Sequence, residues 1–427
     1  MRTFGAPLAL VVCALSLAAQ NGGDAKQRVK AIRDLAKSGS EAIARIQPFL
    51  NDPDLDVRIE AVKAIDDIGG PRSVDPLIQA TRDNDPEVQI RATDGLVNFY
   101  SPGYIKTGLS GSIRRVGNAI KGRWTDTNDL VIDPYVQVRP DVILALGTLA
   151  SGGASMEARA NAARALGILR GRAALDDLIQ ALHSKDDLVI YESLIAIQKI
   201  HDPSAAPRIA FLLRDLNDKV QIAALETTGL LGNKQAIPQV RDAVDHARNE
   251  KIRRAALSAL AMLPDESNRK IYSAYLSDKD DALRAAAAEG LARLKNPSDL
   301  PAMNRMFDSE KKMNARLAFA FAAAALGNNG LTEFSPLQYL VNTLNSKAWR
   351  GVAQAYLVEL ARDPGIRRTL YAALQQGTRD EKIYLGQALA RSGDADTLKY
   401  LEALASDPDP DVSAEGLRAL RTLKARL

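Results

Sequence analysis

Apolar residues recur along this chain with a short period and a long one. Within each helical segment they stand three or four residues apart, as at Ala61, Ile65 and Ile68, which is the spacing of one helix face. The segments themselves return in steps of 31 or 32 residues, with one longer gap. The position of Val57 recurs at Val88, Val189, Val220, Ile252, Leu283 and Ala315, and more loosely near Trp349, Ile383 and Val412. The pattern predicts a chain of similar helices.

Between successive helices of this series lies a second helical segment. Examples are "SVDPLIQAT" (73–81), "QAIPQVRDAV" (235–244) and "DTLKYLEAL" (396–404). The repeating unit is therefore a helix A, a short turn and a helix B. We count a lone helix at about 26–37 and then eleven pairs that end near Leu423.

One pair of short helices cannot bury its apolar stripe alone, so neighbouring pairs must stack into a continuous core. The sequence thus predicts an all-α fold, a curved right-handed α-solenoid (superhelix) of about eleven helix pairs with one insertion. The aromatic content of only 5% against 46% hydrophobic residues agrees with closely packed helices.

The insertion interrupts the repeats at about 100–137, between N-terminal repeats at 20–99 and C-terminal repeats at 138–427. It carries a stripe of apolar residues at helical spacing, and between Gly103 and Trp124 it has five basic residues and no acidic one. The stripe consists of Ile105, Leu109, Ile113, Val116, Ile120 and Trp124. Our candidate partner-binding residues are Lys106, Arg114, Arg115, Lys121, Arg123 and Trp124.

Three interpretations of the insertion stay open. A basic amphipathic segment can bind an anionic partner or lie on an anionic membrane surface. Alternatively, its apolar residues dock on neighbouring repeats as an elaborated loop, or the segment is disordered. Gly108, Gly111, Gly117 and Gly122 each weaken a helix by about 1 kcal/mol relative to alanine, so an isolated helix is disfavoured.

The first 19 residues have the pattern of a secretory signal peptide. Arg2 gives a positive start, an uncharged apolar run extends from Ala6 to Ala19, and small residues stand before Gln20. Cys13 is the single cysteine and lies inside this run, where Val12 before it argues against a lipoprotein anchor. We therefore expect an exported protein, periplasmic or extracellular, whose mature chain has no thiol.

Composition and motifs give no support to an enzyme. The 56 basic and 52 acidic residues nearly balance, which argues against a nucleic-acid binder. The three histidines, His183, His201 and His246, have no metal-ligand spacing and belong to different repeats. Phosphate-binding, dinucleotide-binding and nucleophile-elbow motifs are absent from the sequence. We expect no cofactor, no metal and no catalytic residue.

Arginines recur near the start of helix B, at Arg58, Arg91, Arg159, Arg253, Arg284 and Arg316. They could form a basic stripe for a partner. The interpretation that we favour is a structural ladder, in which arginines such as Arg58 and Arg91 bond aspartates such as Asp54 and Asp85 and join one repeat to the next. Regular spacing is what such a ladder would produce.

The repeat resembles the HEAT repeat, in particular the phycobilisome-lyase HEAT-like variety. The residues that carry the resemblance are "DLDVRIEAVKAIDDIGG" (54–70), "MEARANAARALGILRG" (156–171), "ALRAAAAEGLARLKN" (282–296) and "DPDPDVSAEGLRAL" (407–420). It covers nearly all of the mature chain, and it implies a solenoid whose B helices line an inner surface. It does not by itself imply one function.

The resemblance raises two enzymatic alternatives. Some HEAT-like proteins are di-iron hydroxylases that hold their metals with paired His-Glu dipeptides, but here Ser184, Asp202 and Ala247 follow the histidines. Phycobilin lyases act on cytosolic pigment proteins, whereas this chain is expected to be exported. We therefore expect a non-catalytic scaffold that binds a protein or peptide on its inner surface, with a peripheral membrane or envelope factor as the alternative.

Overall fold

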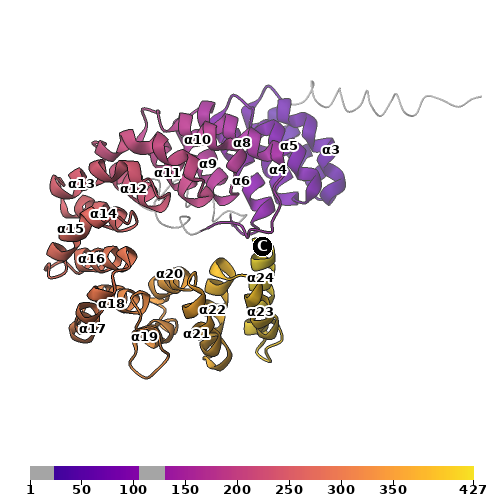
Figure 1. Ribbon diagram of the computed structural model, residues 1–427. Helices are drawn as coiled ribbons and strands as arrows, with labels where there is room; N and C mark the ends of the chain where they lie inside the picture. The colour runs from indigo at the N-terminus through magenta and orange to yellow at the C-terminus, as the bar shows by residue number, and fades with distance from the viewer. Residues whose placement is uncertain (1–23, 105–129) are drawn as a thin grey trace, which may run out of the picture. The chain divides into compact units, whose positions relative to one another are not determined.

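The computed structural model describes residues 24–104 and 130–427, and all regular elements in these residues are helical (Figure 1). A first helix, α2 (Ala25–Ala36), is followed by eleven A–B pairs, which confirms the predicted all-α solenoid. The A segments are Gly39–Ala42, Ile43–Ile46 and Gln47–Asn51 (η1, α3 and η2 together), α5 (Val74–Ala80), α8 (Pro140–Gly152), α10 (Leu175–Ala181), η5 (Pro203–Arg214), α13 (Ile237–Asp245), α15 (Arg269–Tyr275), α17 (Leu300–Ser309), α19 (Pro336–Thr343), α21 (Pro364–Gln376) and α23 (Leu398–Ala405).

The B helices are the longer partners of most pairs. They are α4 (Leu55–Ile68), α6 (Pro86–Tyr100), α9 (Met156–Ile168), α11 (Asp187–Ile200), α12 (Asp218–Leu230), α14 (Glu250–Ala261), α16 (Asp281–Leu294), α18 (Met313–Ala325), α20 (Arg350–Leu360), α22 (Arg379–Ser392) and α24 (Pro410–Lys424). Within each compact unit described below, consecutive B helices pack on one another and form one layer, while the A segments form the other.

Aspartate and asparagine side chains start most B helices. Asp54 accepts hydrogen bonds from the backbone N–H groups of Asp56 and Val57, and Asp85 does the same for the first turn of α6. The same cap recurs at Asp186, Asn217, Asn249, Asp280 and Asp409. A side-chain oxygen at this position satisfies N–H groups that have no partner inside the helix, which explains why the turn sequence is repeated with the helix.

The recurring apolar position marks where each B helix enters the core. Val57, Val88 and Val189 are fully buried, and so are their later copies Val220 and Ala315. The layer is packed with small side chains, and α18 is the extreme case, since nine of its thirteen residues are buried and six of these are alanine. Small residues let neighbouring helices approach closely.

The A segment of the fifth pair departs from the α-helix. η5 is a 3₁₀ helix over Pro203–Arg214 with Pro207 inside it. Proline lacks the N–H that an α-helix would use and its ring clashes with the carbonyl four residues earlier, so the tighter helix replaces the α-helix here.

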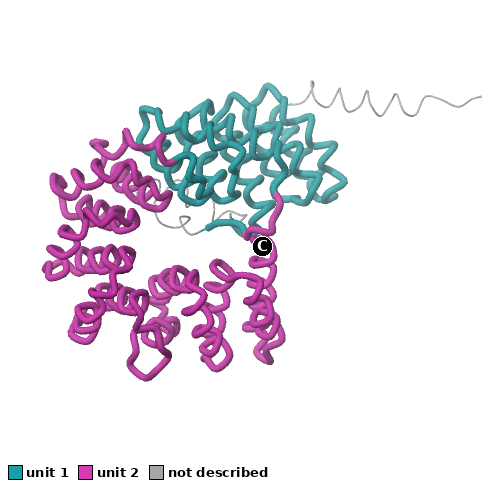
Figure 2. The backbone as a smooth tube through the Cα atoms, viewed as in Figure 1, with its two compact units in different colours: residues 1–132, 138–205 teal, residues 133–137, 206–427 magenta. Residues whose placement is uncertain are grey.

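The chain divides into two compact units (Figure 2). Unit 1 consists of residues 1–132 and 138–205, and unit 2 of residues 133–137 and 206–427. The main boundary falls inside η5. The signal-like segment 1–19 and most of the insertion 100–137 lie outside the described residues. Among the described helices, none has the length and apolar character needed to cross a membrane.

Candidate binding surfaces

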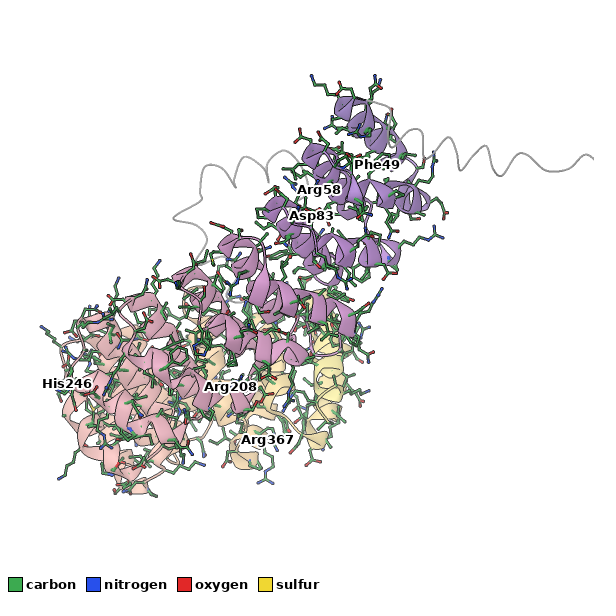
Figure 3. The ribbon with its side chains drawn as sticks, turned by 90° about the horizontal axis from the view of Figure 1, so that it is seen from above. Phe49, Arg58, Asp83, Arg208, His246 and Arg367 are labelled. Carbon is green, nitrogen blue, oxygen red and sulfur yellow. The ribbon has the colours of Figure 1, made fainter. Side chains whose placement is uncertain are left out.

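The side chain that follows the recurring apolar residue joins one repeat to the next. In Arg58, Nη1 donates to the carbonyl of Asp52 at 2.9 Å, in the turn before its own helix. Its Nε donates to Oδ2 of Asp83 at 2.8 Å, in the A–B turn of the following repeat. The two residues are labelled next to each other in Figure 3. We call such a link between a B helix and the next A–B turn a rung.

The same geometry recurs in unit 2. Arg284 donates to the carbonyl of Asp278 at 2.7 Å and to Glu310 of the next repeat at 2.8 Å. Lys382 reaches Asp407 of the next repeat at 2.8 Å. Since the side chains of Arg284 and Glu310 are only 13% and 11% exposed, the rung is a half-buried link and not a free surface charge.

A charged side chain is not essential to a rung. Gln89 donates to the carbonyl of Asp83 at 2.6 Å and accepts from the backbone N–H of Ala154 at 2.9 Å. Of these two bonds, Arg159 makes only the first in the described residues, to the carbonyl of Ala150 in its own repeat, at 3.1 Å. The shared element is a donor for a carbonyl at the end of helix A, where helix geometry leaves carbonyls without partners.

The sequence suggested that Asp54 and Asp85 are the acids of the ladder, but in the structure they do not pair with the ladder arginines. Asp54 and Asp85 cap their own helices, and Asp83, two positions before the cap, pairs with Arg58. At these two caps the carboxylate faces N–H groups of its own helix, whereas the cap Asp280 of α16 also pairs with Arg254 of the previous repeat.

Two of the candidate ladder arginines form pairs inside their own helix. Arg91 lies two positions after the rung residue Gln89 and pairs with Glu87 at 2.7 Å. Arg253 pairs with Glu250 three residues earlier. Neither pair links two repeats.

A polar cluster lies on the B layer of unit 1. The guanidinium of Arg164 on α9 pairs with Glu192 on α11, and the two side chains are 12% and 3% exposed. Nη1 of Arg164 also donates to Asn161 at 3.4 Å, and Asn161 donates to Asp94 on α6 at 2.9 Å. Burial raises the pKa of nearby Tyr104 to about 12, with Asp94 adding to the rise. We call these five residues the Arg164 cluster.

A second polar cluster lies on the B layer of unit 2. Arg293 on α16 donates through Nε and Nη2 to Glu359 on α20, both at 2.8 Å, and through Nη1 to Glu289 at 3.1 Å. The guanidinium lies 5.5 Å from the ring centre of Phe321 on α18. Tyr356 stacks on Phe321 and donates its O–H to Glu289 at 2.6 Å. We call these five residues the Arg293 cluster.

The tyrosine of the second cluster holds its proton firmly. Burial is the main cause that raises the pKa of Tyr356 well above 10, and the negative charge of Glu289 adds to it. The hydroxyl is therefore a hydrogen-bond donor to Glu289 throughout the neutral range, and it cannot serve as a base.

A polar row continues along the B layer of unit 2. Gln354 on α20 donates to the carbonyl of Tyr384 and to Oε1 of Gln387 on α22, both at 2.9 Å. Arg350 lies 4.3 Å from the ring centre of Tyr384 and pairs with Asp380 at 3.1 Å. These five side chains are half-exposed, so a partner can reach them. We call them the B-layer row.

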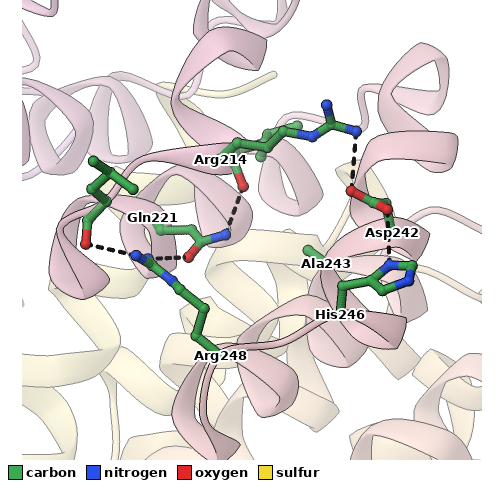
Figure 4. A pocket seen from close by; sticks show the side chains of 8 residues that line it. Arg214, Gln221, Asp242, Ala243, His246 and Arg248 are labelled. Atoms are coloured by element: carbon green, nitrogen blue, oxygen red, sulfur yellow. Dashed lines mark hydrogen bonds and ion pairs between the residues drawn. The ribbon is translucent and has the colours of Figure 1, made fainter.

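A small cavity of about 170 Å³ lies between η5, α12 and α13 (Figure 4). Asp242 at its edge pairs with Arg214 and with Nδ1 of His246, both at 3.0 Å. Arg248 donates to Gln221 at 2.8 Å and to two backbone carbonyls. The volume is below the range of about 300–1,000 Å³ typical of ligand sites, and the polar groups bond one another.

A larger cleft of about 500 Å³ separates α5 from α8 in unit 1. Ile78, Leu149 and the exposed Leu144 line it, and Arg82 lies at one end. The structure contains nothing that shows what covers these apolar side chains.

The remaining candidate residues give no chemical site. Lys106, Arg114, Arg115, Lys121, Arg123 and Trp124 lie outside the described residues. His201 ends α11 in the left-handed conformation with φ of 55°, and His183 lies in the turn after α10. No group of three or more metal-ligating side chains occurs in residues 24–104 and 130–427.

Comparison with known proteins places the repeats in a family. The model for HEAT repeats matches residues 14–97, 205–271 and 246–324, and the model for the PBS lyase HEAT-like repeat matches residues 158–184. Deoxyhypusine hydroxylase-B from Oryza sativa subsp. japonica is 23% identical over 275 residues, which cover 60% of this chain and 83% of that protein.

Solved structures align with this chain at low identity and with TM-scores below 0.5. The CpcE–CpcF complex of phycocyanin lyase from Nostoc sp. aligns with 71% of this chain and 94% of that chain, at 19% identity and a TM-score of 0.33. Kap121p bound to Nup53p aligns with 100% of this chain and 58% of that chain, at 12% identity and a TM-score of 0.43.

Proposed function

Because this chain is a HEAT-repeat protein, we propose that it is an exported, non-catalytic scaffold that binds a protein or peptide along its B layer. In a repeat array each unit contacts its neighbours, and the stacked helices offer an extended surface on which many weak contacts add up. The family alone does not fix this function, so the proposal rests on the residues of the layer.

The observation that carries the proposal is the B-layer row. In it, the amide of Gln354 on one B helix bonds the amide of Gln387 and the backbone carbonyl of Tyr384 on the next, and the side chains of all three residues are half-exposed. Amides such as Gln354 and Gln387 have both donors and acceptors, so they can exchange bonds with each other for bonds with the backbone of a bound peptide.

A capture experiment tests the surface. Tagged mature protein would be incubated with the source organism's envelope fraction, beside the double variant Gln354→Lys with Gln387→Lys. The matched control is Gln375→Lys with Gln376→Lys, because these two exposed glutamines lie on α21, in the layer of A segments. We expect one protein to be captured by the wild type and the control and lost from the B-layer variant. Equal capture by all three would reject the surface.

The insertion is the second element to test. A variant that lacks residues 103–124 removes the candidate residues Lys106, Arg114, Arg115, Lys121, Arg123 and Trp124. If the insertion shapes the binding surface, this variant loses the same protein. Flotation of the intact protein with anionic vesicles, and not of the deletion variant, would favour the membrane alternative.

Two further measurements test the absence of catalysis and the export. Protein purified from iron-supplemented cells should hold much less than one iron per chain, since the His-Glu dipeptides of the hydroxylases are missing. Residues 1–19 fused to a phosphatase that is active only outside the cytoplasm should give activity, and an Arg insertion into the apolar run Ala6–Ala19 should abolish it.

A further inference from the structure

One rung of unit 2 lacks its acid. Arg316 follows Ala315, so it occupies the position that Arg58 and Arg284 occupy in their repeats. Its guanidinium lies 5.2 Å from the ring centre of Phe307 and 4.8 Å from that of Tyr339. Within the described residues, no carboxylate forms an ion pair with Arg316. Its Nε is buried without a hydrogen-bond acceptor.

The missing acid can be assigned to one position. The rung acids Asp83 and Asp407 each donate their backbone N–H to the carbonyl three residues earlier, at 3.2 and 3.1 Å, as helix A ends. Asp83 and Asp407 are the last residues of their turns that donate such a bond to helix A. In the repeat after Arg316, the last one is Ser346, which follows Leu344 and Asn345 and donates to Thr343 at 2.9 Å. A short neutral side chain thus stands where the rungs of Arg58 and Lys382 have a carboxylate.

The surroundings of this incomplete rung are basic. Lys311 and Lys312 precede α18, and Lys347 follows Ser346. All three lysines are exposed, and no ion pair of theirs occurs in the part of the chain that the structure describes. The acid next to Lys311, Glu310, is already held by Arg284.

The other rungs show what fits beside such an arginine. Asp83 meets Arg58, and Glu310 meets Arg284, each with two carboxylate oxygens opposite Nε and Nη2. Arginine and carboxylate have matching planar geometry, and the paired hydrogen bonds are stronger than neutral ones. An unpaired guanidinium beside two aromatic rings is stabilised in part by its contact with the rings, but its hydrogen-bonding capacity is unused.

We propose that Arg316 is the docking point for an aspartate or glutamate side chain of a partner protein. An acidic peptide segment supplies from outside the carboxylate that Asp83 supplies to Arg58 within the chain. Lys311, Lys312 and Lys347 attract further acidic residues of the same segment. The site lies at an A–B turn and does not depend on the binding surface proposed for the B layer.

Peptide binding tests this site directly. A fluorescent peptide with three glutamates between glycine and serine residues would be titrated into the full mature chain at low salt and followed by anisotropy, beside the same peptide with glutamines. The main variant is Ser346→Asp, which restores the acid, and its neutral control is Ser346→Asn. Arg316→Gln removes the guanidinium.

The expected results separate the site from a general charge effect. We expect Ser346→Asp and Arg316→Gln to weaken the acidic peptide about tenfold, and Ser346→Asn to change little. Ser346→Asp should also raise the Tm by about 2 °C, because the new carboxylate completes the rung. The glutamine peptide should not bind.

Two results would overturn the proposal. Equal binding of the acidic peptide by the wild type and Ser346→Asp would show that no docking occurs at this rung. The second result would come from a binding experiment with vesicles of phosphatidylglycerol and phosphatidylcholine. If Ser346→Asp releases the protein from these vesicles while the acidic peptide binds no form of it, the site recognises a lipid headgroup and the protein partner is excluded.

Discussion

The Arg164 cluster and the Arg293 cluster each contain an arginine, a glutamate and a tyrosine, and they join their helices differently. In unit 1, Arg164 pairs with Glu192 on the next B helix, and both side chains are nearly excluded from solvent. In unit 2, Arg293 passes over a whole helix and pairs with Glu359 on α20, whose side chain is 34% exposed. The first cluster links each helix only to the next one, from α6 through α9 to α11, whereas the second contains an ion pair that skips α18.

The helix that lies between α16 and α20 explains the difference. α18 contributes mostly alanine to its surroundings, so side chains of α16 and α20 can meet across it. Phe321 is the large residue at the crossing, and both Arg293 and Tyr356 lie against its ring. Small residues thus do more than fill the core here, because they decide which helices become neighbours.

Removing the arginine of the more deeply buried pair should have the largest effect. Arg164→Met leaves Glu192 as a buried carboxylate without its cation, and we expect a loss of about 3–5 kcal/mol in the free energy of unfolding. Urea unfolding followed by circular dichroism measures it. The double variant Arg164→Met with Glu192→Leu should recover most of the loss. If it is no more stable than the single variant, the pair does not govern this interface.

The matching change in unit 2 should cost less. Arg293→Met leaves Glu359 partly hydrated, and Tyr356 still donates to Glu289, so we expect a loss of about 2–3 kcal/mol. The chain has two tryptophans, and in a Trp124→Phe background Trp349, just before α20, reports on unit 2 alone. A loss larger than that of Arg164→Met would contradict the role assigned to solvent exposure.

The tyrosine hydroxyl provides a finer test of the Arg293 cluster. Tyr356→Phe should cost about 1–2 kcal/mol, because hydrogen bonds to charged groups are stronger than neutral ones. Tyr272→Phe is the control, since its O–H donates to the backbone carbonyl of Leu260 at 2.8 Å. A smaller loss at Tyr356 than at Tyr272 would rule out a contribution from the charge of Glu289.

The stability of Tyr356→Phe should also depend on pH differently from that of the wild type. The pKa of Tyr356 is raised in the folded state, so the folded protein retains a proton that the unfolded chain releases near pH 10. The resulting stability is complete below pH 10 and is lost as the pH rises through the higher folded value. Urea titrations above pH 10 should therefore show a steeper loss for the wild type than for Tyr356→Phe.

The smallest effect is expected at a carboxylate of the B layer that lacks a cation. The carboxylate of Glu226 on α12 has no hydrogen bond or ion pair in the described residues, and desolvation raises its pKa. A raised carboxylate pKa lowers stability at neutral pH, and the loss disappears as the pH falls below the unfolded value. Glu226→Gln should stabilise the protein by less than about 0.5 kcal/mol at pH 7 and have no effect near pH 3, as measured by Tm. A stabilisation that persists at pH 3 would exclude the carboxylate as its cause.

The sequence revealed the repeat because every B helix needs the same parts. A buried residue such as Val57 and a cap such as Asp54 must return in each copy, so periodicity alone predicted the helix pairs and their order. Periodicity did not predict two features. The first is the role of each turn aspartate: Asp85 caps a helix, Asp83 two positions earlier meets an arginine, and Asp280 does both.

The second feature is the pair of Arg293 and Glu359. Its partners lie 66 residues apart and skip one repeat, so no local pattern marks them. The signal that could have suggested the contact is the run of alanines in α18, which leaves room above that helix. The incomplete rung, by contrast, was visible in the turn "NSKAW" (345–349), but only the backbone hydrogen bond of Ser346 identified the position that lacks the acid.

The rungs also determine the order in which the chain can fold. The partners of a rung are 25 or 26 residues apart at Arg58, Arg284 and Lys382, so each link can close once the next turn has been made. Contacts between residues close in sequence favour rapid folding. The link from Arg293 to Glu359 must wait until α18 and α20 have both formed. Among these links, it is therefore the one whose first partner waits longest for its second, 66 residues, along a chain that folds from its N-terminus.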